Sequence, residues 1–207
     1  MAKRSTSRVI RIALNIKFWL EGPPEVTEVR PACCPGCGQS GAPVGERIRL
    51  VGHGIRTREI RGPLRAEEKA ATRTLFVRRF LCRDCGAVIT VVPREVAPGR
   101  LYAAGAIALA LVLFGVAGLP AEQILERLRP TSERGHDRRR WRVLDRWLSS
   151  IREGRLFPRL PAAPPSEATP LRRMSAFYAR QLAARSRRLE AEFEALAMDG
   201  VMMAIAA

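Results

Sequence analysis

Four of the five cysteines in this 207-residue chain stand in two C-x-x-C-G units, at 34–38 and 82–86. A C-x-x-C turn brings two thiolates to one side of a bend, and two such turns can enclose Zn²⁺ in a closed tetrahedron. The glycine after each pair suits the bend that lets backbone amides approach the sulfurs. The spacing therefore predicts a structural zinc site formed by Cys34, Cys37, Cys82 and Cys85.

Cys33 is the ambiguous residue of the first unit, because it directly precedes Cys34 and could replace it as a ligand. The C-P-G-C spacing favours Cys34. A catalytic dithiol is the redox alternative, but it needs a C-x-x-C at a helix start in a βαβ unit, which the sequence does not predict. His53 lies in a predicted loop, where a histidine is more often solvated than ligating, and we leave it out of the site.

The formal net charge is +16, from 36 Lys and Arg against 20 Asp and Glu, and it indicates a polyanionic partner such as nucleic acid or an anionic membrane. Residues 44–80 contain ten basic and four acidic side chains, and residues 122–160 contain eleven and six. A generally arginine-rich composition is the alternative explanation, since only three of the basic residues are lysines. The hydrophobic content of 47% is enough for a folded core.

The N-terminal residues do not have the pattern of a secretory signal. Arg11 and Lys17 interrupt the apolar run, and no small-residue cleavage site follows. We therefore expect a cytoplasmic chain, whose thiols stay reduced. Paired cysteines in such a chain are more often metal ligands than disulfides.

The first half of the chain is expected to be a β-rich zinc ribbon with a long hairpin, covering residues 1–97. Alternating apolar and polar residues predict strands at 11–18, 46–54, 74–82 and 87–93. The polar, glycine-containing residues between the middle two strands, 52–73, are expected to form a long hairpin loop. Residues 21–31 are expected to be a linker into the first cysteine pair.

The second half is expected to be helical, which makes the fold class α+β. Helices are predicted at 101–121, 121–128 and about 136–151, with Gly118 in the turn after the first. This order is typical of a helix-turn-helix domain, which we assign to residues 98–156.

A Pro/Ala-rich linker over 157–170 separates this domain from a last segment, 171–207. An amphipathic helix from about 171 to 198 is expected there, with an apolar stripe at near-heptad spacing that consists of Leu171, Met174, Tyr178, Leu182, Leu189, Phe193 and Leu196. Two interpretations of the stripe stay open. It forms a homodimer or binds a partner protein, or it packs back on the same chain.

The third predicted helix has an arginine face. Arg138, Arg142 and Arg146 recur at i, i+4 and i+8, and Arg139 widens this face. The last helix of a helix-turn-helix unit lies in the major groove, so these four arginines are expected to contact double-stranded DNA. Trp141 and Trp147 are expected to anchor the helix to the core. A solvated arginine face without a ligand is the alternative.

Residues 101–121 have no charged side chain over 21 positions, which meets the length criterion for a membrane span. Six alanines and three glycines among residues 101–118 dilute the apolar character, and arginines flank both ends. A membrane-anchored zinc-ribbon protein is therefore the less favoured alternative. A zinc-ribbon adaptor that binds other proteins is a further one.

The stretch from CCPGCG to RRRWRVLDRWL resembles the N-terminal zinc-ribbon and helix-turn-helix region of bacterial insertion-sequence transposases, and a family of uncharacterised stand-alone bacterial proteins with that region. The matching elements lie within about residues 30–150: R-R-F-x-C-x-x-C-G at 78–86, Pro93, and R-W at 146–147. Such transposases have a nuclease domain downstream, whereas the acidic residues after 150 fall in a predicted linker and one helix. The resemblance implies DNA binding without catalysis, by an accessory protein, a regulator or a remnant of a mobile element.

Overall fold

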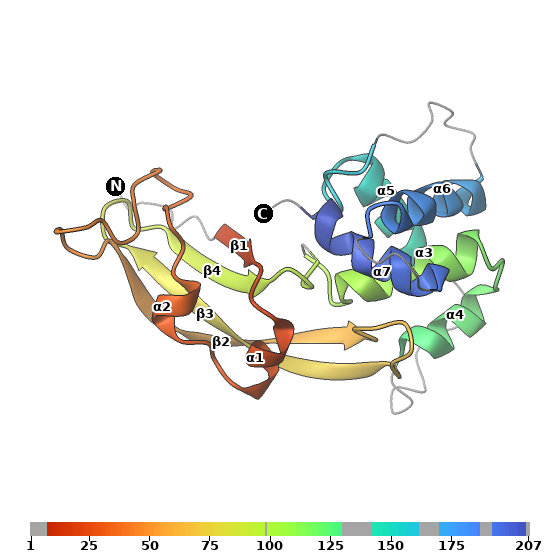
Figure 1. The fold of residues 1–207 in the computed structure, drawn as a ribbon, viewed down its shortest axis with the longest axis horizontal. Coiled ribbons are helices and arrows are strands. Elements are labelled where there is room, and N and C mark those ends of the chain that lie inside the picture. The colour runs from red at the N-terminus through yellow and green to blue at the C-terminus, as the bar shows by residue number, and fades with distance from the viewer. Residues whose placement is uncertain (1–7, 98, 130–141, 162–169, 187–191, 206–207) are drawn as a thin grey trace. The chain divides into compact units, whose positions relative to one another are not determined.

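The computed structural model describes residues 8–97, 99–129, 142–161, 170–186 and 192–205. These residues form an α+β structure with a four-stranded sheet and seven helices (Figure 1). The chain divides into two compact units. Unit 1 contains Met1–Glu59 and Arg73–Arg94, and unit 2 contains Ile60–Thr72 and Glu95–Ala206.

The sheet has the strand order β1-β4-β3-β2. Its strands are β1 (Arg8–Ile12), β2 (Leu50–Gly62), β3 (Ala71–Cys82) and β4 (Val88–Pro93). Strand β4 pairs antiparallel with β3 and parallel with β1, so Phe80 lies opposite Ile89 and Ile10 lies opposite Val91. Phe80, Ile89 and Val91 are fully buried and belong to the core of unit 1.

The strands predicted at 74–82 and 87–93 are confirmed, but the long hairpin loop over 52–73 is wrong. Strand β2 begins at Leu50 and continues to Gly62, so only residues 63–70 connect it to β3. Most side chains from 52 to 59 are exposed. A sequence pattern reveals a strand through the apolar residues of its buried face. The exposed part of β2 lacks such a face and is held in the sheet by backbone hydrogen bonds, so the pattern does not reveal it.

The strand predicted at 11–18 is wrong beyond Ile12, because Ile16–Glu21 forms helix α1. The Asn15 side chain accepts a hydrogen bond from the backbone N–H of Lys17 at 3.0 Å, which caps the helix start. Ile16 and Trp19 are buried at helical spacing, whereas Phe18 is 56% exposed. The alternation of apolar residues is therefore not the pattern that determines burial here.

The expected linker at 21–31 contains a short helix, α2 (Val26–Val29). A capping box holds its first turn, in which the backbone N–H of Glu25 donates to the Glu28 carboxylate at 3.1 Å. Val29 is buried. Helix α2 leads the chain directly into the first cysteine pair.

Unit 2 is a helical bundle around α3 (Ala104–Gly115). Helices α4 (Ala121–Leu128), α5 (Val143–Arg152), α6 (Leu171–Ala183) and α7 (Phe193–Ala204) all contact α3 (Figure 1). Nine of the 12 residues of α3 are buried, with no polar stripe. A helix that is covered on all sides needs no charged face, which explains the uncharged stretch in the sequence.

Helix α3 is shorter than the predicted helix at 101–121, because it begins at Ala104 and ends at Gly115. The turn after it contains Gly118 in a left-handed conformation, with φ at 71°. The helix predicted at 121–128 is confirmed as α4. Among the residues that the structure describes, no helix is both long enough and apolar enough to cross a membrane.

The third predicted helix, 136–151, is present from Val143 onward as α5, and its first residues, 136–141, lie outside the described residues. The single helix predicted at 171–198 is wrong, since two helices, α6 and α7, contact each other and α3. A side chain at Gly200 would collide with the Leu182 carbonyl, so the glycine permits this close approach. Met174, Tyr178 and Leu182 of the apolar stripe are buried within unit 2.

Candidate metal centre

The first cysteine pair lies in a tight loop between α2 and β2. The Cys34 N–H donates to the Gln39 carbonyl at 2.8 Å, and the Gly38 N–H donates back to the Cys34 carbonyl at 2.8 Å. Gly38 has a φ of 75°, a conformation that glycine adopts without strain. The backbone N–H of Gly36 donates to the Cys34 Sγ, with the nitrogen 3.3 Å from the sulfur, so one backbone donor already faces this sulfur.

The second cysteine pair, between β3 and β4, repeats this geometry. The Cys82 N–H donates to the Ala87 carbonyl, and the Gly86 N–H donates back to the Cys82 carbonyl, both at 2.9 Å. Gly86 has a φ of 71°. The two C-x-x-C-G units of the sequence are therefore two copies of one backbone loop, as their shared spacing predicts.

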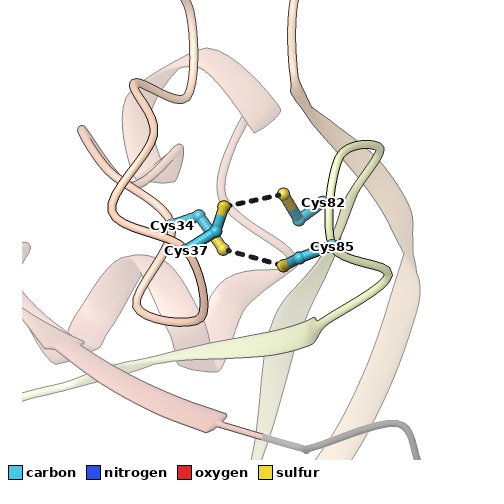
Figure 2. A group of neighbouring side chains, drawn as sticks. All are labelled: Cys34, Cys37, Cys82 and Cys85. Carbon is cyan, nitrogen blue, oxygen red and sulfur yellow. Dashed lines mark hydrogen bonds between the residues drawn. The ribbon is translucent and has the colours of Figure 1, made fainter. Parts of the chain in front are cut away.

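The structure brings the two loops face to face, with four sulfurs between them (Figure 2). The Sγ atoms of Cys34 and Cys85 are 3.7 Å apart, and those of Cys37 and Cys82 are 3.8 Å apart. All four Sγ atoms lie within 4.8 Å of one another. Four sulfurs at ~2.3 Å from a tetrahedral Zn²⁺ are separated by roughly 3.8 Å, so the arrangement fits such an ion.

All five cysteines are free thiols. The sulfur separations of 3.7 and 3.8 Å are far longer than the ~2.05 Å of a disulfide bond. Gly36 lies close to the second loop, and a Cβ on it would lie 3.1 Å from the Cys85 Sγ. The glycine in C-P-G-C therefore lets the loops approach each other, a role that the spacing alone does not reveal.

The thiols at this site influence one another strongly. Desolvation raises the pKa of Cys82, but the backbone N–H groups of Cys85 and Asp84 and the adjacent thiols outweigh it and lower the pKa to about 7. The backbone N–H of Gln39 favours the thiolate of Cys37, yet desolvation and the surrounding sulfurs raise its pKa to about 12. A thiolate formed at one sulfur opposes ionisation of the next, and a bound cation favours the thiolate form of all four.

Cys33 and His53 lie apart from this group of side chains. Cys33 is exposed and pairs through its backbone with Ser40, whereas Cys34 is buried with its sulfur among the other three. His53 is an exposed residue of strand β2. The four sulfurs that the structure brings together are the four that the C-x-x-C spacing selects.

Substitution of Cys33 is therefore expected to leave metal binding intact. The Cys33→Ser protein should bind the same amount of zinc per chain as the parent, because Cys33 is exposed and its sulfur is not among the four. The Cys34→Ser protein should lose affinity by several orders of magnitude, because three thiolates remain. Metal analysis after gel filtration, combined with chelator competition, measures both quantities. If Cys33→Ser lost zinc affinity and Cys34→Ser kept it, Cys33 would be the ligand.

The arginines predicted to contact DNA are described only in part. Arg142 is the residue before α5, and Arg146 lies one turn into this helix; both are exposed. Trp147 is buried and meets Tyr102 edge to face, with ring centroids 5.3 Å apart. Arg138, Arg139 and Trp141 lie outside the described residues.

Residues around the cysteines that the sequence did not single out include Arg49, whose guanidinium contacts both loops. It donates to the Gln39 side chain at 2.7 Å and lies 3.7 Å from the Asp84 carboxylate. Asp84 lies between Cys82 and Cys85 in the sequence, and this position is the one signal that could have identified Asp84 in advance. No comparable signal marks Arg49.

The chain matches no protein-family model, no curated protein and no solved structure.

Proposed function

We propose that this chain is a zinc protein, in which Cys34, Cys37, Cys82 and Cys85 hold one structural Zn²⁺. The observation that carries the proposal is the set of four sulfurs within 4.8 Å of one another, supplied by two equivalent loops. Four thiolates close the coordination sphere and leave no position for a substrate, which is the composition of a structural site. Tetrahedral sulfur sites also accept iron, so the metal itself is part of what the experiment must determine.

Zinc is expected to join segments that are far apart in the chain. The first loop follows α2 and the second connects β3 to β4, with 44 residues between Cys37 and Cys82. A shared ion fixes the first loop against the sheet that carries the second. Two equivalent cysteine loops, one of which connects the paired strands β3 and β4, support the zinc ribbon that the sequence resemblance implies.

We further propose that the protein binds double-stranded DNA without catalysing a reaction on it. The net charge of +16 supports a polyanionic partner. In unit 2, α3, α4 and α5 follow in the order of a helix-turn-helix unit, with Gly118 in the first turn. Helix α5 buries Leu144, Trp147 and Leu148. Arg146 in this helix and Arg142 directly before it are exposed.

Such a protein acts in the cytoplasm of a bacterium, on DNA, as an accessory or regulatory protein of a mobile element or as a remnant of one. This context rests on the resemblance to the DNA-binding region of insertion-sequence transposases. We take α5 as the helix that contacts DNA, because its exposed arginines lie opposite the residues that anchor the helix to the core. The two statements are tested separately.

The DNA proposal predicts a specific salt dependence. Each arginine–phosphate contact releases condensed counterions, so log affinity falls with log salt by about 0.9 per contact. The double substitution Arg142→Ala/Arg146→Ala should weaken duplex binding and reduce that slope by roughly two. Titration of a fluorescent duplex at several salt concentrations measures both the affinity and the slope.

A matched control removes the same charge from the other end of the helix. Arg152 lies in the last turn of α5, and Arg155 follows the helix; both are exposed. The double substitution Arg152→Ala/Arg155→Ala should change the slope much less, because the N-terminal part of a recognition helix lies closest to the bases. Equal effects of the two pairs would mean that α5 contributes only net charge. An unchanged slope in the first pair would exclude α5 as the DNA contact.

A further inference from the structure

Arg49 connects the two cysteine loops through its backbone as well as its side chain. Its N–H donates to the Gly41 carbonyl at 3.0 Å, just after the first loop, and its carbonyl accepts from the Arg83 N–H at 3.0 Å, inside the second. One residue therefore bonds to both halves of a site whose cysteine pairs are distant in sequence. These two backbone hydrogen bonds hold Arg49, the residue directly before β2, between the two loops, so its side chain can contact both.

The guanidinium of Arg49 extends the same connection. Its Nη1 donates to the Gln39 Oε1 at 2.7 Å and lies 3.7 Å from the Asp84 Oδ2, while its Nη2 donates to the Glu46 Oε2 at 2.6 Å. Gln39 and Asp84 belong to the first and second loops. A planar guanidinium can serve three such acceptors at once, because its donors form a rigid fork.

The positive charge of Arg49 lies beside a site that is expected to be negatively charged. A zinc ion with four thiolates has a net negative charge, since Zn²⁺ neutralises only two of them. The Arg49 guanidinium contacts the carboxylates of Glu46 and Asp84, and Asp84 lies between two of the cysteines, so a cation lies beside the second loop. The side chain is 24% exposed, so water and salt screen this charge in part, but less than they screen a fully exposed charge.

We propose that Arg49 is a positioning residue of the metal centre, which holds the two loops together through Gln39 and Asp84 and stabilises the four thiolates by its positive charge. The inference rests on the proposed zinc site. Outer residues that orient metal ligands change metal affinity by about 10–100-fold when they are replaced. Arg49 is such a residue by its contacts, although it binds no metal itself.

The test measures zinc affinity by competition with a chromophoric chelator at fixed pH. Arg49→Ala should bind zinc about 10–100-fold more weakly than the parent. Arg49→Lys should recover much of this loss because it keeps the charge, whereas the neutral Arg49→Gln should not. The neighbour Arg47 is the matched control, since its side chain is 71% exposed and lies 3.5 Å from the Asp84 carboxylate. Arg47→Ala should change the affinity by less than about threefold.

A purely structural role for Arg49 would give a different ranking. If Gln and Lys restored binding equally, or if Arg49→Ala bound zinc as tightly as the parent, the proposed electrostatic role would be wrong. Higher ionic strength should weaken zinc binding by the parent more than by Arg49→Gln, because the variant lacks the Arg49 cation whose attraction to the thiolates salt screens.

Two further measurements keep the outcomes distinct. Should Arg49→Ala fail to fold, Gln39→Ala removes one acceptor of the same guanidinium at an exposed position, and it should weaken zinc binding severalfold. Parental affinity in Gln39→Ala would then count against the inference. A parent protein that binds no zinc would refute the proposed function itself, whereas a tight parent with an unchanged Arg49→Ala refutes only the role of Arg49.

Discussion

Removal of zinc is expected to unfold the cysteine loops and the adjoining part of unit 1. A closed site of four thiolates contributes an apparent binding free energy on the order of 10 kcal/mol, comparable to the whole stability of a small domain. The apo protein must also keep four thiols side by side, where each thiolate opposes the next. We expect chelation, or the double substitution Cys34→Ser/Cys82→Ser, to abolish amide protection around both loops.

Hydrogen exchange read by mass spectrometry measures this loss segment by segment. Peptides that contain Cys34 or Cys82 should exchange rapidly after chelation, and zinc should restore their protection. Peptides from α3 and α6 should remain protected, because these helices pack within unit 2. The Cys33→Ser protein is the control for thiol loss outside the site. Full protection of both loops in metal-free protein, or iron in place of zinc in the isolated protein, would contradict the proposal.

The cysteine centre is the part of this molecule that the sequence predicts best. Two C-x-x-C-G units are local motifs, and a local motif fixes its own backbone loop whatever the rest of the chain does. Both loops indeed share one hydrogen-bond pattern. The contribution of Arg49 could not be predicted in the same way, because it depends on the position of β2 between two distant loops, which no spacing encodes.

The failed predictions concern segments in which tertiary packing outweighs the local pattern. Alternation over 11–18 predicts a strand, but the Asn15 cap and the burial of Trp19 favour a helix. The apolar stripe after 171 predicts one long helix, whereas two helices bury it against α3. Each pattern identified only part of the buried set: Ile16 and Met174 are buried, whereas Phe18 is 56% and Leu171 43% exposed. The residues against which these side chains pack belong to other parts of the fold. Those residues decide whether the segment forms a strand, one helix or two helices.

Replacement of Trp147 by alanine is expected to destabilise unit 2 severely. Its indole is 1% exposed and packs edge to face on Tyr102, at 5.3 Å between ring centroids. Truncation of a buried tryptophan to alanine costs about 3–5 kcal/mol, since the cavity left behind is not refilled. Thermal unfolding followed by the helical circular dichroism signal should show a midpoint lower by on the order of 10 °C or more.

The neighbouring residue provides the control that separates stability from DNA binding. Arg146 is exposed on the same helix, so Arg146→Ala should change the free energy of unfolding by less than about 0.5 kcal/mol while it weakens binding to duplex DNA. Trp147→Ala should lose DNA binding only at temperatures where unit 2 unfolds. If Trp147→Ala kept the parental midpoint, the indole would not anchor α5. If it lost DNA binding while fully folded, the tryptophan itself would have to contact the DNA, and the opposite face of α5 would have to be considered as the recognition surface.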